Sequence, residues 1–253
     1  MMSRFRKAAE KVRATGVLER LIALRDRTLS FSQFGEDVHI ASFLDRLKHD
    51  RGIVVRPGWI VDVGSFRPIK FSNTYLFYRR GWRCINIDPT PGTKRLFDRV
   101  RPRDINLQVA IGPERGSANF YVFGQPSVWN TMDKEAADEA AAKLRIQPKV
   151  FSTDVLRLED VLSKHLGDQP LEMLLVDAEG YDIEILKSHD FERWAPRLIL
   201  IEVHGVNAGT LNTNPVLQYL EERAYHLHSW INPSLLFVRG DSTLPQKNQA
   251  KSS

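Results

Sequence analysis

The stretch that decides the fold is WIVDVGSFRPIKFSNTYLFYRRGWRCINIDPTP, which runs from Trp59 to Pro91. An apolar run ends in Asp62 and Gly64, a polar loop and a helix-like segment follow, and a second apolar run ends in Asp88. This order is typical of a nucleotide-binding βαβ unit, in which the carboxyl ends of neighbouring strands hold the ligand. The further glycines that let a backbone approach a pyrophosphate are missing after Gly64. The stretch therefore resembles only part of a dinucleotide-binding motif.

The rest of the chain continues the alternation of strands and helices. Extended-type runs occur at Ile60–Val63, Cys84–Asp88, Asn106–Ile111, Leu171–Asp177, Leu198–Val203, His226–Ile231 and Leu235–Val238. Helix-like segments occur at Phe71–Tyr78, Thr93–Val100, Tyr181–His189 and Pro215–Arg223. Such alternation predicts an α/β fold with a parallel sheet and helices on both faces.

The last two strands are joined only by Asn232–Ser234, and so short a connection permits only an antiparallel hairpin. A mostly parallel seven-stranded sheet that ends in an antiparallel hairpin is the order expected of the class I methyltransferase, Rossmann-like fold. Two segments are additional to that order: a strand at Gly116–Phe123 and an Ala-rich helix at Lys134–Ile146.

Composition predicts one globular domain with additions at both ends. Residues 1–30 form a basic amphipathic leader, residues 31–240 the α/β domain, and residues 241–253 a polar, disordered tail. The single cysteine, Cys84, excludes an internal disulfide. No apolar run approaches the roughly 20 residues of a membrane span, and the N-terminus lacks the apolar core of a signal peptide. These features predict a cytoplasmic protein.

The net charge of +5 comes entirely from the leader, which carries eight Lys/Arg and three Asp/Glu. The remaining chain holds twenty-eight of each sign, so no nucleic-acid partner is predicted. The leader also has apolar residues at helical spacing, among them Phe5, Val12, Leu18 and Leu21. A helix packed on the domain is favoured, and weak contact of residues 1–27 with an anionic membrane surface is the alternative.

The acid that closes the second strand indicates the ligand. Asp88 can accept hydrogen bonds from both hydroxyls of a ribose, which indicates an adenosine. S-adenosylmethionine has the ribose and no pyrophosphate, and its charged amino-acid end suits a polar group such as Asp62. The pattern favours S-adenosylmethionine over NAD as the cofactor.

Four motifs together resemble the FkbM-type methyltransferase family. They are FSQFGED at Phe31–Asp37, the Trp59–Pro91 stretch, LLVDAEGYDIEILKSHDF at Leu174–Phe191, and LILIEVHG at Leu198–Gly205. The resemblance extends from about Phe31 to Val238 and leaves the leader and the segment Lys134–Ile146 unexplained. It implies an S-adenosylmethionine-dependent O-methyltransferase that acts on a hydroxyl of a sugar, a polysaccharide or a glycosylated natural product.

The resemblance also implies a set of cofactor-binding residues. Asp62, Gly64 and Ser65 would line the methionine end of the cofactor, and Asp88 would bind the ribose. The cofactor would also be contacted by Gln33, Gly35 and Asn73. For FSQFGED an alternative stays open, in which Ser32 caps a helix and the acids suit its first turn.

A second group of polar residues follows the fourth and fifth strands. Asp177, Glu179 and His204 lie at or beyond carboxyl strand ends, where catalytic groups gather in this architecture. His204 is predicted as the general base for an acceptor hydroxyl, and Glu179 or Asp177 could instead be base, cofactor contact or metal ligand. Glu202 is interpreted as a supporting residue, because Val203 beside it alternates to the other face. A divalent metal is left open but is not predicted.

The acceptor is a small molecule or a glycan, and it is expected to meet SVWNTM, Ser127–Met132. Trp129 is predicted to stack on a sugar face and Asn130 to hydrogen-bond a hydroxyl. The alternatives are an N- or carboxyl-methyltransferase and a binding protein of this fold without catalysis. An NAD-dependent sugar-modifying enzyme is disfavoured by the missing glycines.

Overall fold

The structure is a computed structural model that describes residues 29–178, 180–207 and 209–242. The chain divides into two compact units, Met1–Ser30 and Phe31–Ser253. The predicted leader helix and most of the predicted tail lie outside the described residues. All the helices and strands that the structure describes belong to the second unit.

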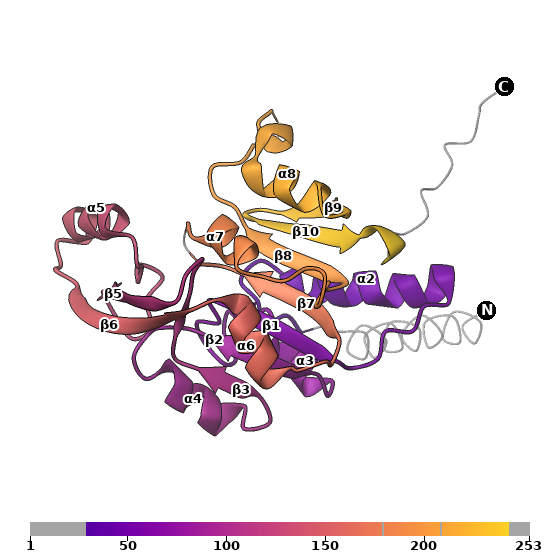
Figure 1. Cartoon of the computed structure of the whole chain (residues 1–253), viewed down its shortest axis with the longest axis horizontal. Coiled ribbons are helices and arrows are strands. Elements are labelled where there is room, and N and C mark those ends of the chain that lie inside the picture. Colours follow the sequence, from indigo (N-terminus) through magenta and orange to yellow (C-terminus); the bar gives the residue numbers. More distant parts are fainter. Residues whose placement is uncertain (1–28, 179, 208, 243–253) are drawn as a thin grey trace, which may run out of the picture. The chain divides into compact units, whose positions relative to one another are not determined.

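A seven-stranded sheet forms the centre of this unit (Figure 1). Its strands are β1 (Trp59–Val63), β2 (Arg83–Ile87), β3 (Ile105–Leu107), β7 (Leu171–Val176), β8 (Leu198–Glu202), β9 (Tyr225–Ile231) and β10 (Ser234–Arg239). They lie in the order β3-β2-β1-β7-β8-β10-β9. Strands β3, β2, β1, β7 and β8 are parallel, and β10 runs antiparallel to both β8 and β9. The predicted fold class, including the terminal hairpin, is confirmed.

Both faces of the sheet are buried under helices, and successive side chains of a strand belong to the two different core clusters. Ile60 belongs to a core cluster with α2 (Glu36–Arg51) and α3 (Tyr75–Arg79). Its neighbour Val61 belongs to the other cluster, with α6 (Leu158–His165), α7 (Asp182–Lys187) and α8 (Pro215–Glu221). Because successive side chains of a strand point to opposite faces, a continuous apolar strand requires helices on both sides.

The predicted strand Asn106–Ile111 is wrong as a single strand. Its first part is β3 in the large sheet, and its end is β4 (Ala110–Ile111) in a separate three-stranded sheet of order β4-β6-β5. That sheet contains the predicted extra strand, β5 (Gly116–Val122), and a strand that the sequence did not reveal, β6 (Lys149–Leu156). Most side chains of β6 are exposed or half-buried, so it lacks the apolar run that marked the other strands. The predicted Ala-rich helix is α5 (Lys134–Leu144), between β5 and β6.

Two helices begin later than the sequence indicated. Helix α2 has Gly35 at its N-cap, with φ of 89°, in place of Ser32. The Ser32 hydroxyl instead accepts hydrogen bonds from the amides of Gly35 and Asp37, at 3.1 and 3.4 Å. The predicted helix Phe71–Tyr78 begins only at Tyr75, because Phe71 takes a left-handed conformation with φ of 60°. Helix α4 (Thr93–Val100) has the predicted bounds.

Within the described ranges, no helix combines the length and the apolar character that crossing a bilayer requires.

Candidate active site

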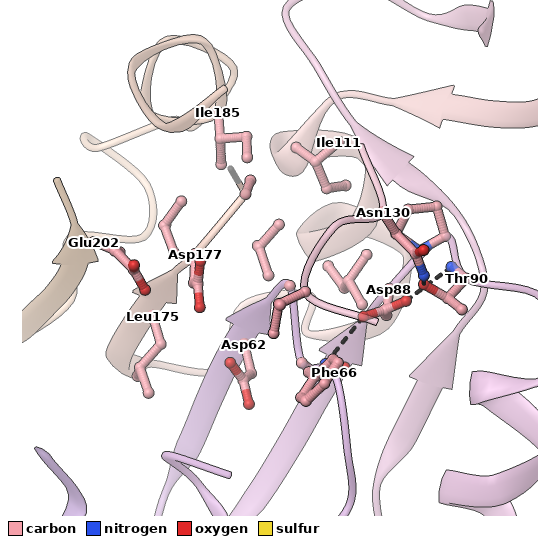
Figure 2. A pocket seen from close by; sticks show the side chains of 18 of the residues that line it. Asp62, Phe66, Asp88, Thr90, Ile111, Asn130, Leu175, Asp177, Ile185 and Glu202 are labelled. Atoms are coloured by element: carbon pink, nitrogen blue, oxygen red, sulfur yellow. Dashed lines mark hydrogen bonds between the residues drawn. The ribbon is translucent and has the colours of Figure 1, made fainter. Parts of the chain in front are cut away.

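A cavity of about 410 Å³ opens at the carboxyl ends of β1, β2, β7 and β8. The strand order reverses at β1, which has β2 on one side and β7 on the other. In open α/β sheets ligands bind at this point, because the connections leave the sheet in opposite directions and leave a crevice. Figure 2 shows Glu202 and Asp177 on one side of the cavity, Asp88, Thr90 and Asn130 on the other, and Asp62 between them.

The turn after β1 brings the chain into contact with β7. Gly64 has φ of 83°, and a Cβ built on it would lie 1.7 Å from the carbonyl oxygen of Asp177. The amide of Asp177 donates to the carbonyl of Val63 at 2.9 Å, which fixes the close approach. Gly64 lines the cavity, and the physical need for glycine there is this contact between two strands.

Asp62 is buried at the bottom of the cavity, and a hydrogen bond from a side chain outside the lining fixes its carboxylate. Its Oδ2 accepts a hydrogen bond from the Thr74 hydroxyl at 2.9 Å. A fully buried guanidinium, that of Arg101, donates to the same Thr74 oxygen at 2.9 Å and to the Asp104 carboxylate at 2.7 Å. Burial raises the pKa of Asp62 to about 6, and the charge of Arg101 opposes that rise. Sequence reasoning missed Arg101, since nothing in the sequence sets it apart from the other arginines nearby.

Asp88 closes β2 and is also buried. Its Oδ2 accepts the amide hydrogen of Phe66 at 3.0 Å, and its Oδ1 accepts that of Thr90 at 2.8 Å. Burial raises the pKa of Asp88, and the hydrogen bonds from Thr90 and Phe66 counteract the rise. A carboxylate has about four acceptor positions, so Asp88 keeps capacity for a further donor.

Ser65 presents the clearest unmet hydrogen-bonding group of the cavity. Its side chain is 4% exposed, and its Oγ has no hydrogen-bond partner within the described residues. A buried hydroxyl without a partner costs free energy, which a ligand with a polar group would relieve. Ser65 lies on the cavity wall beside Asp62 and Asp88.

Of the three further residues predicted to contact the cofactor, Gln33, Gly35 and Asn73, two line the cavity. Gln33 and Asn73 line it. Gly35 does not: the structure places it outside the lining, at the N-cap of α2.

The other end of the cavity holds Asp177, Glu202 and His204. Nε2 of His204 lies 3.1 Å from Oε1 of Glu202; the Glu202 side chain is 20% exposed and that of His204 is 59% exposed. Glu202, interpreted from the sequence as a supporting residue, itself lines the cavity and lies next to His204. Glu202 is the last residue of β8 and His204 lies in the turn that follows, so this turn brings the two side chains together. Glu179 lies outside the described residues.

Within those residues, no three histidine, cysteine, aspartate or glutamate side chains are grouped as a metal site would need.

The segment Ser127–Met132 forms a wall of the cavity. Asn130 is buried, and its amide is engaged in the loop itself: Oδ1 accepts from the amides of Phe123 and Gly124, and Nδ2 donates to the Gly124 carbonyl and the Thr90 hydroxyl. These bonds give Asn130 a role in holding the loop against Thr90, because its polar atoms already have partners. Trp129 lines the cavity and is 37% exposed, with the Lys143 ammonium 4.8 Å from its ring centroid.

Three aromatic residues of the lining, Phe66, Phe71 and Phe120, were not singled out from the sequence. Phe66 and Phe71 lie nearly parallel, with ring centroids 6.5 Å apart, and both have positive φ. Their position depends on the loop conformation between β1 and α3, for which the sequence offers no periodic signal.

Comparison with protein-family models gives a match to the methyltransferase FkbM domain over residues 62–227. No curated protein and no solved structure matches the chain significantly. The matched range covers more than half of the chain, starts at the Asp62 that forms the bottom of the cavity and includes Asp88, Asp177, Glu202 and His204. The chain therefore belongs to the FkbM methyltransferase family and is a methyltransferase.

Proposed function

We propose that the enzyme is an S-adenosylmethionine-dependent O-methyltransferase that acts on a hydroxyl of a sugar, a polysaccharide or a glycosylated natural product. The observation that carries the proposal is that one cavity joins two different polar groups. The buried carboxylates Asp62 and Asp88 lie at the bottom and on one side of it, and the pair Glu202 and His204 lies on the other side. The first group suits a nucleoside with a charged tail, and the second suits removal of a proton from an acceptor.

The cofactor assignment agrees with the hydrogen-bonding groups of the cavity. Asp88 keeps acceptor capacity for the ribose, and Asp62 offers a carboxylate to an ammonium group. Ser65 supplies the hydroxyl that lacks a partner within the described residues. A volume of about 410 Å³ is within the usual range of small-molecule sites, about 300–1,000 Å³.

The first three amides of the turn after β1 are already engaged and are not available to a pyrophosphate. The amides of Gly64 and Ser65 donate to the Ile87 carbonyl at 2.9 and 3.1 Å, and that of Phe66 donates to Asp88. The next helix begins only at Tyr75, so no helix N-terminus directly follows the turn. Since dinucleotide sites bind phosphate through such amides, these contacts support S-adenosylmethionine over NAD.

S-adenosylmethionine supplies a methyl group on a sulfonium, which a nucleophile can displace. An alcohol is a weak nucleophile, so its proton must be accepted as the new oxygen–carbon bond forms. In this proposal His204 accepts that proton through a ring nitrogen. The Glu202 carboxylate orients the ring and stabilises the imidazolium that results. Trp129 forms part of the wall against which a sugar ring would stack.

We assign the enzyme to the cytoplasm, on the basis of its one cysteine, Cys84, which is buried as a free thiol in the core.

Calorimetric titration with S-adenosylmethionine, S-adenosylhomocysteine and NAD tests the cofactor. The wild type should bind the first two, and Asp88→Ala should weaken both by about 1–3 kcal/mol, because the ribose hydroxyls lose their acceptor. Asp98→Ala is the control: this exposed carboxylate of α4 is bound to Lys94 and Asn106 and is not part of the cavity lining, so its loss should leave the affinity unchanged. Equal affinities of wild type and Asp88→Ala, or preferential binding of NAD, would refute the assignment.

A further inference from the structure

A buried arginine lies behind the cavity. Arg101 directly follows α4, and its side chain is fully buried, as is the side chain of Asp104. A guanidinium stays charged in proteins, and taking it out of water is costly unless an opposite charge and hydrogen bonds compensate. Asp104 supplies the opposite charge, because Nε of Arg101 donates to its Oδ2 at 2.7 Å. The donors at the other end of the guanidinium face different groups.

Those donors hold the segment just before α3. Nη1 of Arg101 donates to the Thr74 hydroxyl at 2.9 Å and to the Ser72 hydroxyl at 3.3 Å. Ser72 and Thr74 are buried, whereas Asn73 between them lines the cavity. Arg101 therefore fixes the residues on both sides of a cavity residue and is itself outside the lining.

The hydrogen bond from Arg101 gives the Thr74 hydroxyl a direction. A guanidinium can only donate, so the Thr74 oxygen accepts in this contact and its own hydrogen is left for another acceptor. Oδ2 of Asp62 lies 2.9 Å from this oxygen, nearer than the Ser72 hydroxyl at 3.4 Å. We call this chain of hydrogen bonds, from Arg101 through Thr74 to Asp62, the Asp62 relay.

The charge of Arg101 acts on the same carboxylate. Burial raises the pKa of Asp62, and two nearby carboxylates raise it further, those of Asp88 and Asp104. Arg101 and the hydrogen bond from Thr74 lower the pKa of Asp62. More negative charge lies in the same cavity lining, on Asp177 and Glu202. The relay thus favours an ionised Asp62 in surroundings that oppose its ionisation.

We propose that Arg101 makes the cavity selective for the amino-acid end of the cofactor, acting through Thr74 on the Asp62 carboxylate. This inference rests on the proposed S-adenosylmethionine site and adds to it a positioning residue that lies outside the cavity lining. An ammonium group binds strongly to an ionised and oriented carboxylate and weakly to a neutral one.

The adenosine end of the cofactor does not depend on the relay. The proposed ribose acceptor, Asp88, takes its hydrogen bonds from the amides of Phe66 and Thr90. Loss of the relay should therefore weaken the binding of one end of the ligand and spare the other.

Titration calorimetry at pH 7.5 with two ligands tests this selectivity. S-adenosylhomocysteine carries the amino-acid end, and 5′-methylthioadenosine keeps the adenosine and the sulfur without it. Thr74→Val removes the hydroxyl with little change of shape and should lower the affinity for S-adenosylhomocysteine at least about tenfold, because the buried Asp62 carboxylate loses its donor. The same variant should bind 5′-methylthioadenosine within about twofold of wild type. Thr74→Ser keeps the hydroxyl and should restore most of the affinity for S-adenosylhomocysteine.

A matched control and a second variant accompany this test. Thr153→Val changes another buried threonine, on β6 and outside the lining, and should bind both ligands like wild type. Arg101→Met removes the charge and should show the same selective loss as Thr74→Val. Because it leaves Asp104 without its opposite charge, thermal melting verifies its fold, and Thr74→Val, which keeps that ion pair, tests the relay by itself.

An NMR titration of the Asp62 carboxyl carbon tests the relay without any ligand. In Thr74→Val this carboxyl should titrate at a higher pH than in wild type, because the ionised form has lost a hydrogen bond. An unchanged titration would overturn the proposal.

The ligand pair separates failure of this inference from failure of the cofactor assignment. If Thr74→Val binds S-adenosylhomocysteine like wild type, or loses both ligands equally, the relay does not set the selectivity, and the cofactor assignment stands. If the wild type binds neither ligand, the cofactor assignment is refuted and the proposed selectivity with it.

Discussion

Nε2 of His204 lies 3.1 Å from Oε1 of Glu202, two residues earlier at the end of β8. Glu202 ends the strand, His204 lies in the turn after it, and both residues line the cavity. A carboxylate at this distance fixes the imidazole and favours the ring after it has accepted a proton.

The first prediction concerns this pair. His204→Ala should lower the rate of methyl transfer by about 10²–10⁴ and leave the affinity for S-adenosylhomocysteine nearly unchanged. Glu202→Gln should lower the rate by about tenfold or more, because the amide keeps the shape but loses the charge that stabilises the imidazolium. The double variant should be no slower than His204→Ala, since the two residues act as a unit. The measurement is transfer from methyl-labelled S-adenosylmethionine to a panel of hydroxylated sugars.

A metal mechanism predicts another pattern: EDTA abolishes activity, Mg²⁺ restores it, and Asp177 variants are inactive. If His204→Ala keeps full activity and EDTA has no effect, the base is another group, and Glu179 is the first to substitute.

The second prediction follows from the raised pKa of Asp62, about 6. An ammonium group of the cofactor requires the ionised carboxylate, so affinity for S-adenosylhomocysteine should rise as pH increases through about 6. Asp62→Asn should bind weakly and lose this pH dependence, as titration calorimetry from pH 5 to 7.5 would show. A pH profile equal to that of wild type would exclude Asp62 as the titrating group.

The same raised pKa makes the stability of the ligand-free protein fall as pH rises, whereas the affinity for S-adenosylhomocysteine increases with pH. The folded state favours protonated Asp62, so this contribution is complete below the ordinary pKa of 3.8 and is lost as pH rises through about 6.

The third prediction concerns a buried histidine outside the cavity. Burial lowers the pKa of His189 to about 4, and its Nε2 lies 2.9 Å from the Trp194 carbonyl oxygen. The folded state disfavours the added proton, so stability should be lost as pH falls from the ordinary value of 6.5 towards 4, by at most about 3 kcal/mol. His189→Gln keeps a donor for the carbonyl and removes the titration. Denaturant unfolding between pH 4.5 and 7 should therefore show a weaker acid-side loss in this variant, and an unchanged loss would contradict the assignment.

The fourth prediction compares two glycines with nearly the same backbone angle. Gly64→Ala should destabilise the fold by about 3 kcal/mol or more, because its Cβ would meet the Asp177 carbonyl at 1.7 Å in addition to the strain of φ at 83°. Gly35→Ala, with φ of 89° and nothing within 4 Å, should cost only about 1–2 kcal/mol. Urea unfolding measures both. Because Gly35 lies outside the cavity lining, Gly35→Ala should also bind S-adenosylhomocysteine like wild type, and a loss of affinity would restore its predicted cofactor contact.

The sequence alone determined the sheet and the strand ends that bear function. Asp62 and Asp88 each stand at or near the end of an apolar run, and strand periodicity with the rule for parallel sheets suffices to bring them to one edge. The terminal hairpin followed from a connection too short for anything else. These features depend on residues near one another in the chain, and local patterns report them.

The tertiary structure alone decided which polar groups are free and which are already bound. Asn130 reaches Thr90, forty residues away, and Arg101 reaches Ser72 and Thr74 across more than twenty-five. Burial and hydrogen-bond saturation are properties of such long-range contacts, so the sequence could not show that Asn130 is engaged, that Ser65 lacks a partner within the described residues, or that Arg101 supports Asp62.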